Sequence, residues 1–152
     1  MKMYMDGCRL NRLFDDQSRD KIRIETEAVV SILSRCTSGG DWTLIGSDVI
    51  SLEISKNPDP IKKQKTTLLH DCASQKIKHN PVIKHRSGEL QKYNIKLFDS
   101  LHLATAEFAK VDVFLTTDER LIRAATRSDI NIRVANPLAY YLEVLNNDQP
   151  SD

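Results

Sequence analysis

The chain has 152 residues, of which 40% are hydrophobic and 28% are charged, as in an ordinary globular domain. Five glycines and five prolines exclude a fibrous or low-complexity chain, and the longest uncharged stretch, residues 134–142, is too short to span a membrane. The net charge of +1 argues against nucleic-acid binding by bulk electrostatics. We predict one domain over residues 1–146 and a disordered tail over residues 147–152.

The N-terminus and the cysteines predict a cytoplasmic protein. Asp6 interrupts the first residues before the apolar run of a signal peptide can form. Cys8, Cys36 and Cys72 are odd in number and widely separated, with no C-x-x-C pair. We therefore expect reduced thiols rather than a disulfide framework or a zinc site.

The first third of the chain alternates strand and helix patterns. Residues 1–5 alternate in period two and predict a strand that ends at Asp6. Apolar residues recur at helical spacing over residues 22–36, and a Thr-Ser-Gly-Gly run ends that helix. Residues 42–45 predict a buried strand, after which Ser47 is suited to cap a helix that carries Glu53.

The middle of the chain is basic. Residues 57–60 break the chain, and Pro60 is suited to begin a helix over residues 61–74, followed by a weakly patterned stretch to Ile95. Residues 61–86 hold seven basic side chains against the single acid Asp71, namely Lys62, Lys63, Lys65, Lys76, Lys78, Lys84 and Arg86. Such a segment is either a solvated helix face or a surface that contacts phosphates.

The last third carries the clearest secondary-structure signals. Asp99 opens a helix with an apolar face, and residues 111–117 form a strand pattern rich in β-branched side chains. Asp118 begins another helix, residues 132–134 predict a short strand, and Pro137 starts a C-terminal helix. Because strands and helices alternate throughout, we predict an α/β fold with a largely parallel sheet.

Four acids fall at or near the ends of these elements. Asp6 and Asp118 follow strands, Glu53 lies early in a helix after a strand, and Asp99 lies at a helix N-terminus. The carboxyl ends of parallel strands share one edge of a sheet, so these acids are expected in one crevice. At about 6 Å and an effective dielectric constant near 20, each carboxylate pair costs about 2 to 3 kcal/mol. Mg²⁺ or Mn²⁺ prefers oxygen ligands and removes that repulsion.

Each acid also has a purely structural interpretation. Asp99 and Asp118 precede helices and are suited to N-capping, and Asp6 is suited to an Asx turn at a strand end. Glu53 is consistent with a solvent-facing helix position. The hypothesis of a metal site therefore depends on all four acids together, and their spacing alone leaves both interpretations open.

The acidic segments resemble the motifs of the PIN domain family, in order over nearly the whole chain. They are Met3-Tyr4-Met5-Asp6, the helix bearing Glu53 after a strand, Phe98-Asp99-Ser100-Leu101-His102-Leu103-Ala104-Thr105-Ala106 and Leu115-Thr116-Thr117-Asp118-Glu119-Arg120-Leu121. The resemblance implies a three-layer α/β/α sandwich around a mostly parallel sheet. Many PIN domains are Mg²⁺- or Mn²⁺-dependent ribonucleases, including VapC-type toxins of toxin–antitoxin pairs.

By the same resemblance, Asp6, Glu53, Asp99 and Asp118 would be both the catalytic residues and the metal ligands. One departure stands out, since PIN domains commonly follow the first Asp with Thr-Asn or Ser-Asn. Here Gly7 and Cys8 follow instead, as in a PIN subgroup whose first motif is rewritten. The next amide is Asn11, which either takes over the ordering role or leaves the site weakened.

Three further side chains are candidates for supporting the acids. His102 lies one turn beyond Asp99 and is either a general acid or a hydrogen-bonded structural histidine. Thr116 and Thr117 either orient Asp118 or pack locally at a strand end. A site of four carboxylates selects hard cations, so we interpret Cys8 as a packing residue.

The sequence thus predicts a Mg²⁺- or Mn²⁺-dependent endoribonuclease, with the toxin of a toxin–antitoxin pair as one form of it. An RNA substrate, an antitoxin protein and a homodimer are the partners that the resemblance implies, and the basic segment would guide the RNA. The alternative is a catalytically weak or inactive PIN-like module that binds RNA or protein. A phosphatase with Asp6 as nucleophile is disfavoured, because Cys8 stands where such enzymes need a second Asp.

Overall fold

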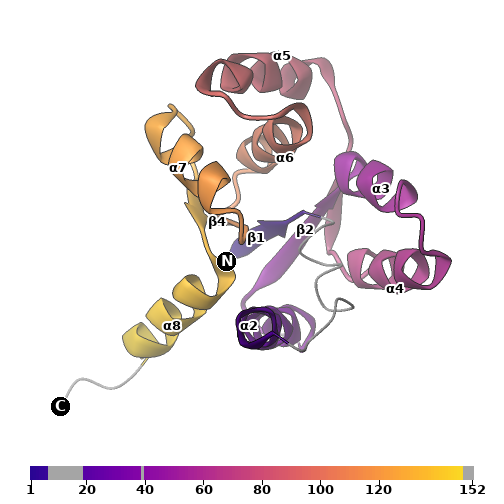
Figure 1. Ribbon diagram of the computed structural model, residues 1–152, viewed down its shortest axis with the longest axis vertical. Coiled ribbons are helices and arrows are strands. Elements are labelled where there is room, and N and C mark those ends of the chain that lie inside the picture. Colours follow the sequence, from indigo (N-terminus) through magenta and orange to yellow (C-terminus); the bar gives the residue numbers. More distant parts are fainter. Residues whose placement is uncertain (7–18, 39, 149–152) are drawn as a thin grey trace.

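Five short strands form a single parallel sheet at the centre of the molecule (Figure 1). The computed structural model describes residues 1–6, 19–38 and 40–148. The strands are β1 (Lys2–Met5), β2 (Thr43–Ser47), β3 (Gln75–Ile77), β4 (Val113–Leu115) and β5 (Arg133–Ala135), in the spatial order β3-β2-β1-β4-β5. The prediction of an α/β fold with a parallel sheet is confirmed.

Helices cover both faces of this sheet. They are α2 (Asp20–Thr37), α3 (Asp48–Ser55), α4 (Pro60–His70), α5 (Pro81–Leu90), α6 (Leu97–Phe108), α7 (Glu119–Arg127) and α8 (Pro137–Asp148), with a short 3₁₀ helix η2 (Gln91–Tyr93). Figure 1 shows α2 and α8 together below the sheet and α5, α6 and α7 above it. Within the described ranges, none of these helices has the length and apolar character needed to cross a membrane.

The ends of several helices agree with the sequence prediction. Ser47 caps α3 by accepting the Ile50 N–H at 3.0 Å, and Pro60 begins α4 directly after its cap Asp59. The C-terminal helix continues to Asp148, so it includes residues 147 and 148, which the sequence analysis assigned to a disordered tail.

The weakly patterned middle of the chain was partly mispredicted. The helix expected over residues 61–74 ends at His70, and residues 75–77 form the edge strand β3. Only Ile77 of that strand is buried, which leaves no alternation to detect. Helix α5 was not predicted because its buried side chains are few and include Ser87. The strand expected over residues 111–117 is limited to β4 at residues 113–115.

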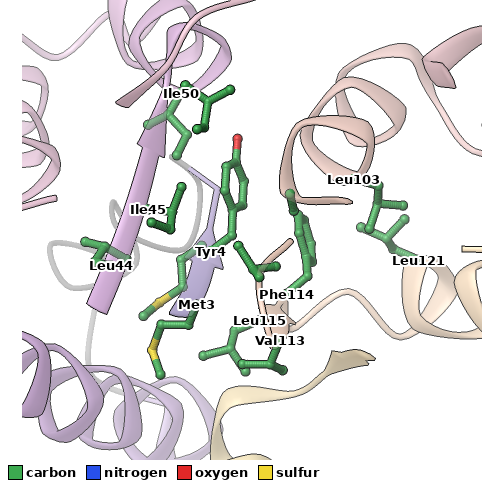
Figure 2. Packing of buried hydrophobic residues seen from close by; sticks show 14 of the residues in the cluster. Met3, Tyr4, Leu44, Ile45, Ile50, Leu103, Val113, Phe114, Leu115 and Leu121 are labelled. Carbon is green, nitrogen blue, oxygen red and sulfur yellow. The ribbon is translucent and has the colours of Figure 1, made fainter. Parts of the chain in front are cut away.

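The core is built around β1, whose edges pair with β2 and β4 and whose two faces are covered by helices, so that Met3, Tyr4 and Met5 are fully buried. The ring of Tyr4 stacks on Phe114, with ring centroids 5.4 Å apart and planes inclined by 15°. Figure 2 shows this stack, with the Tyr4 hydroxyl pointing toward Ile50 at the start of α3. The central position of β1 places the residue after it, Asp6, in the middle of the carboxyl edge of the sheet.

Candidate acidic site

The structure brings the four predicted acids to the same end of the sheet. Asp6 follows β1 and is only 5% exposed. Asp118 follows the neighbouring strand β4, whose Leu115 lies opposite Met5 of β1. Glu53 is supplied by α3, directly after β2, and Asp99 by the first turn of α6.

The charges of these acids act on one another. Burial raises the pKa of the Asp99 carboxyl above its usual value, and the negative charges of Asp6 and Asp118 raise it further. The negative charge of Glu53 adds to this shift. Part of the shift in the pKa of Asp99 therefore comes from the other acids, as expected for carboxylates gathered in one crevice.

Asp118 combines the two roles that the sequence left open. Its Oδ1 accepts the backbone N–H groups of Arg120 at 3.0 Å and Leu121 at 3.2 Å, so it caps α7. Its own N–H donates to Thr116 Oγ1 at 3.1 Å. Thr116, rather than the half-buried Thr117, provides this orienting contact. Asp118 is thus an N-cap that also belongs to the acidic cluster.

His102 is held between Glu53 and Tyr4, one on each side of its ring. Its side chain is fully buried, with Nε2 3.1 Å from Glu53 Oε2 and Nδ1 2.7 Å from the Tyr4 hydroxyl. Tyr4 Oη in turn lies 2.8 Å from Ser47 Oγ. The sequence analysis missed Tyr4 and Ser47, because a tyrosine in a strand and a serine before a helix are typical of core and cap.

Asp99 and Asp118 line a hollow of about 190 Å³ beside the cluster. Its lining also includes the exposed cations Lys96 and Arg120 and the buried side chain of Leu121. The acidic edge is therefore bordered by positive charge and by a patch of apolar surface.

The donors suit a hard divalent cation, because every predicted ligand is a carboxylate. The raised pKa of Asp99 also indicates a negative field that such a cation would neutralise. Within the part of the chain that the structure describes, however, no three His, Cys, Asp or Glu side chains are arranged to hold a metal ion as they stand. The chemistry of the acids fits the ion, and the described arrangement is not a finished coordination shell.

Part of the predicted site lies outside the described residues. Asn11, Gly7 and Cys8 fall between residues 7 and 18, so the effect of the rewritten first motif stays a prediction. Cys36 and Cys72, which are described, are both free thiols, as expected.

The basic segment over residues 61–86 does not act as one surface. Arg86 donates to Glu107 and Asp129, and Lys76 Nζ lies 2.7 Å from Asp71 Oδ1. His70 is only 2% exposed and accepts the Ser47 N–H. Whether this segment guides a phosphate backbone stays a prediction.

Comparisons with known proteins give a fold and no sequence family. No protein-family profile matches the chain, and no curated protein matches its sequence. The chain is similar to one in the crystal structure of VapBC2 from Rickettsia felis bound to a DNA fragment from their promoter, at 14% identity and a TM-score of 0.57. That alignment covers 90% of this chain and 98% of the other.

A second similar structure is VapBC-1 from nontypeable Haemophilus influenzae, at 14% identity and a TM-score of 0.55. It too covers 90% of this chain and 98% of the other. At this level of identity, the likeness establishes the fold alone. The three-layer α/β/α arrangement expected from the PIN resemblance is confirmed.

Proposed function

We propose that the protein is a Mg²⁺- or Mn²⁺-dependent endoribonuclease. The observation that carries this proposal is the gathering of Asp6, Glu53, Asp99 and Asp118 at the carboxyl edge of the parallel sheet. Burial and the negative charges of the other three acids raise the pKa of Asp99, and a bound divalent cation would lower it. The fold shared with chains of VapBC structures supports the same function.

In this proposal the four carboxylates bind the metal ion, and neighbouring side chains orient two of these carboxylates by hydrogen bonds. A bound ion would supply Lewis acidity and lower the pKa of a water molecule. Thr116 orients Asp118 through its N–H, and His102 fixes one oxygen of Glu53. Lys96 and Arg120, which line the hollow beside Asp99 and Asp118, are placed to contact phosphates of a bound strand.

A cleavage assay with mixed RNAs in Mn²⁺, Mg²⁺ or EDTA tests the proposal. We expect cleavage that requires metal and is lost in Asp6→Asn and Asp99→Asn. Asp129→Asn is the matched control, because it removes the same charge from a carboxylate that pairs with Arg86 instead. Equal cleavage by the wild type and all three variants would identify a contaminating nuclease, and no cleavage with any metal would contradict the proposal.

A second candidate is a PIN-like module that binds RNA or protein without cleaving. It is favoured by the absence, among the described residues, of three side chains arranged to hold a metal ion. It is favoured also by Gly7-Cys8 in place of the usual polar pair. RNA binding that is equally tight in Mg²⁺ and in EDTA, without cleavage, would select this candidate.

The partners are part of the same proposal. Both similar structures are VapBC complexes, and one of them is bound to promoter DNA. We propose an antitoxin protein as partner and a homodimer as the state of the isolated chain, in the cytoplasm. Sedimentation of the purified protein distinguishes a dimer from a 17.3 kDa monomer.

A further inference from the structure

A continuous chain of buried hydrogen bonds leads from the start of α3 to Glu53. The Ile50 N–H donates to Ser47 Oγ, which lies 2.8 Å from Tyr4 Oη. Tyr4 Oη lies 2.7 Å from His102 Nδ1, and His102 Nε2 lies 3.1 Å from Glu53 Oε2. Ser47, Tyr4 and His102 are each 0% exposed, and the chain reaches the surface only at Glu53, whose side chain is 21% exposed.

For an ionised Glu53 and a neutral His102, counting hydrogens gives one direction for every bond in this chain. The Glu53 carboxylate can only accept, so His102 Nε2 must carry a hydrogen. A neutral imidazole then has a bare Nδ1, which must accept from the Tyr4 hydroxyl. Because the Tyr4 hydroxyl donates its single hydrogen to His102, Tyr4 Oη must accept from the Ser47 hydroxyl. Ser47 Oγ also accepts the backbone N–H of Ile50. No hydrogen is missing and none is in excess.

We propose that Tyr4 and Ser47 are positioning residues that hold His102 in the Nε2–H tautomer and thereby fix Glu53 as an oriented acceptor at the acidic edge. The consequence for metal binding and cleavage rests on the proposed function, whereas the tautomer itself does not. Partners of this kind behind a metal ligand usually contribute 10- to 100-fold to metal affinity.

The second buried histidine provides an internal reference. His70 Nε2 accepts the backbone N–H of Ser47 at 3.1 Å, so the neutral ring must carry its hydrogen on Nδ1. Ser47 therefore connects the two buried histidines, because its N–H donates to His70 directly and its hydroxyl is linked to His102 through Tyr4. The two rings are required to adopt opposite tautomers within one molecule.

Nitrogen-15 NMR of the metal-free protein at about pH 8 tests this, because long-range correlations distinguish protonated from bare ring nitrogens. We expect Nε2–H at His102 and Nδ1–H at His70, with the exposed His79 and His85 showing averaged signals. His102→Gln assigns the resonances. A hydrogen on Nδ1 of His102, in the other tautomer or in the charged ring, would overturn the proposal.

Binding of Mn²⁺, measured from the free-ion signal in electron paramagnetic resonance, tests the consequence. Tyr4→Phe should weaken Mn²⁺ binding about 10-fold and shift the His102 Nδ1 resonance. Ser87→Ala is the matched control, since it removes a buried hydroxyl that pairs with Ser100 outside this chain of bonds. Equal affinity of Tyr4→Phe and the wild type would overturn the proposed effect on metal binding.

Ser47→Ala keeps the test decisive if Tyr4→Phe does not fold. It removes both the donor to Tyr4 and the α3 cap, whereas Asn80→Ala removes only a comparable cap, on α5. We expect weaker Mn²⁺ binding in Ser47→Ala alone, and equal losses in both variants would overturn the role of Ser47. A wild type that binds no Mn²⁺ would contradict the proposed function, while the histidine spectrum still decides the tautomer.

Discussion

The pKa of a carboxyl group is shifted in opposite directions at the acidic edge of the sheet and at the junction of α5 with α6. At the junction, Arg86 Nε lies 2.7 Å from Glu107 Oε1 and Arg86 Nη2 lies 3.0 Å from Asp129 Oδ1. The hydrogen bond from Arg86 holds the pKa of Asp129 below its usual value. At the edge, burial and the charges of Asp6 and Asp118 push the pKa of Asp99 upward.

This difference separates structural carboxylates from candidate functional ones. At the junction, Arg86 supplies the opposite charge to Glu107 and Asp129. At the acidic edge, the charges that raise the pKa of Asp99 are other carboxylates, and a dissolved divalent cation is the complement that relieves them. Replacing one aspartate by asparagine in each region should therefore change the free energy of unfolding in opposite directions.

The largest effect that we expect is a loss of RNA cleavage in the Asp99→Asn variant. Replacing this carboxylate removes a proposed ligand and one of the charges that attract the ion. Loss of partners behind a metal ligand costs about 10- to 100-fold, so loss of a ligand should reduce kcat/KM by at least about 100-fold. Rates in Mn²⁺ against RNA, measured beside Asp129→Asn, check this. A loss of similar size in Asp129→Asn would remove the distinction between the regions.

The second largest effect that we expect is a loss of stability in the Arg86→Met variant. The methionine keeps much of the packing but leaves Glu107 and Asp129 without their cation. Because Arg86 is only 18% exposed, we expect the free energy of unfolding to fall by about 2 kcal/mol. Urea unfolding measures this, with Mn²⁺ binding as the control that should stay unchanged. A loss of Mn²⁺ affinity would show that the two regions are coupled.

The sequence indicated the candidate site at the acidic edge but not the ion pairs of Arg86. Asp99 and Asp118 lie in recognisable segments, beside an apolar helix face and a β-branched strand, so local pattern predicted their places at the ends of elements and left open whether they form a metal site. Arg86 was grouped with its basic neighbours, because its partners Glu107 and Asp129 lie 21 and 43 residues away. Pairing over such separations depends on the packing of α5 against α6, which no local pattern encodes.

The same limit applies to the core of the candidate site. The period-two pattern predicted that Tyr4 lies in a strand, and the cap preference predicted the role of Ser47 at α3. Neither pattern predicted that the hydroxyls of Tyr4 and Ser47 meet each other and His102. These contacts depend on the parallel register of β1 with β2 and on the docking of α6, both of which are tertiary features.

A smaller effect, of opposite sign, is expected from Asp99→Asn on the stability of the metal-free protein. A raised pKa means that folding disfavours the ionised carboxylate, so its removal at pH 7 should stabilise the fold. Solvent screening reduces the repulsion to about 1 kcal/mol. Urea unfolding in EDTA from pH 7 to 4 checks this. As pH falls through the raised pKa of Asp99, the free energy of unfolding of the wild type should rise relative to that of the variant. His70, whose pKa burial lowers to about 4, contributes equally to both curves.

The smallest effect is expected from Asp129→Asn, and it should destabilise where Asp99→Asn stabilises. The lowered pKa of Asp129 means that its ionised form stabilises the fold above the pKa of the unfolded carboxyl. That contribution is lost as pH falls through the folded pKa, so the two unfolding curves should converge in acid. The loss at pH 7 should be smaller than that of Arg86→Met, because Arg86 keeps Glu107 as a partner and Asp129 is exposed. A gain in stability at pH 7 would show that Arg86 does not neutralise Asp129.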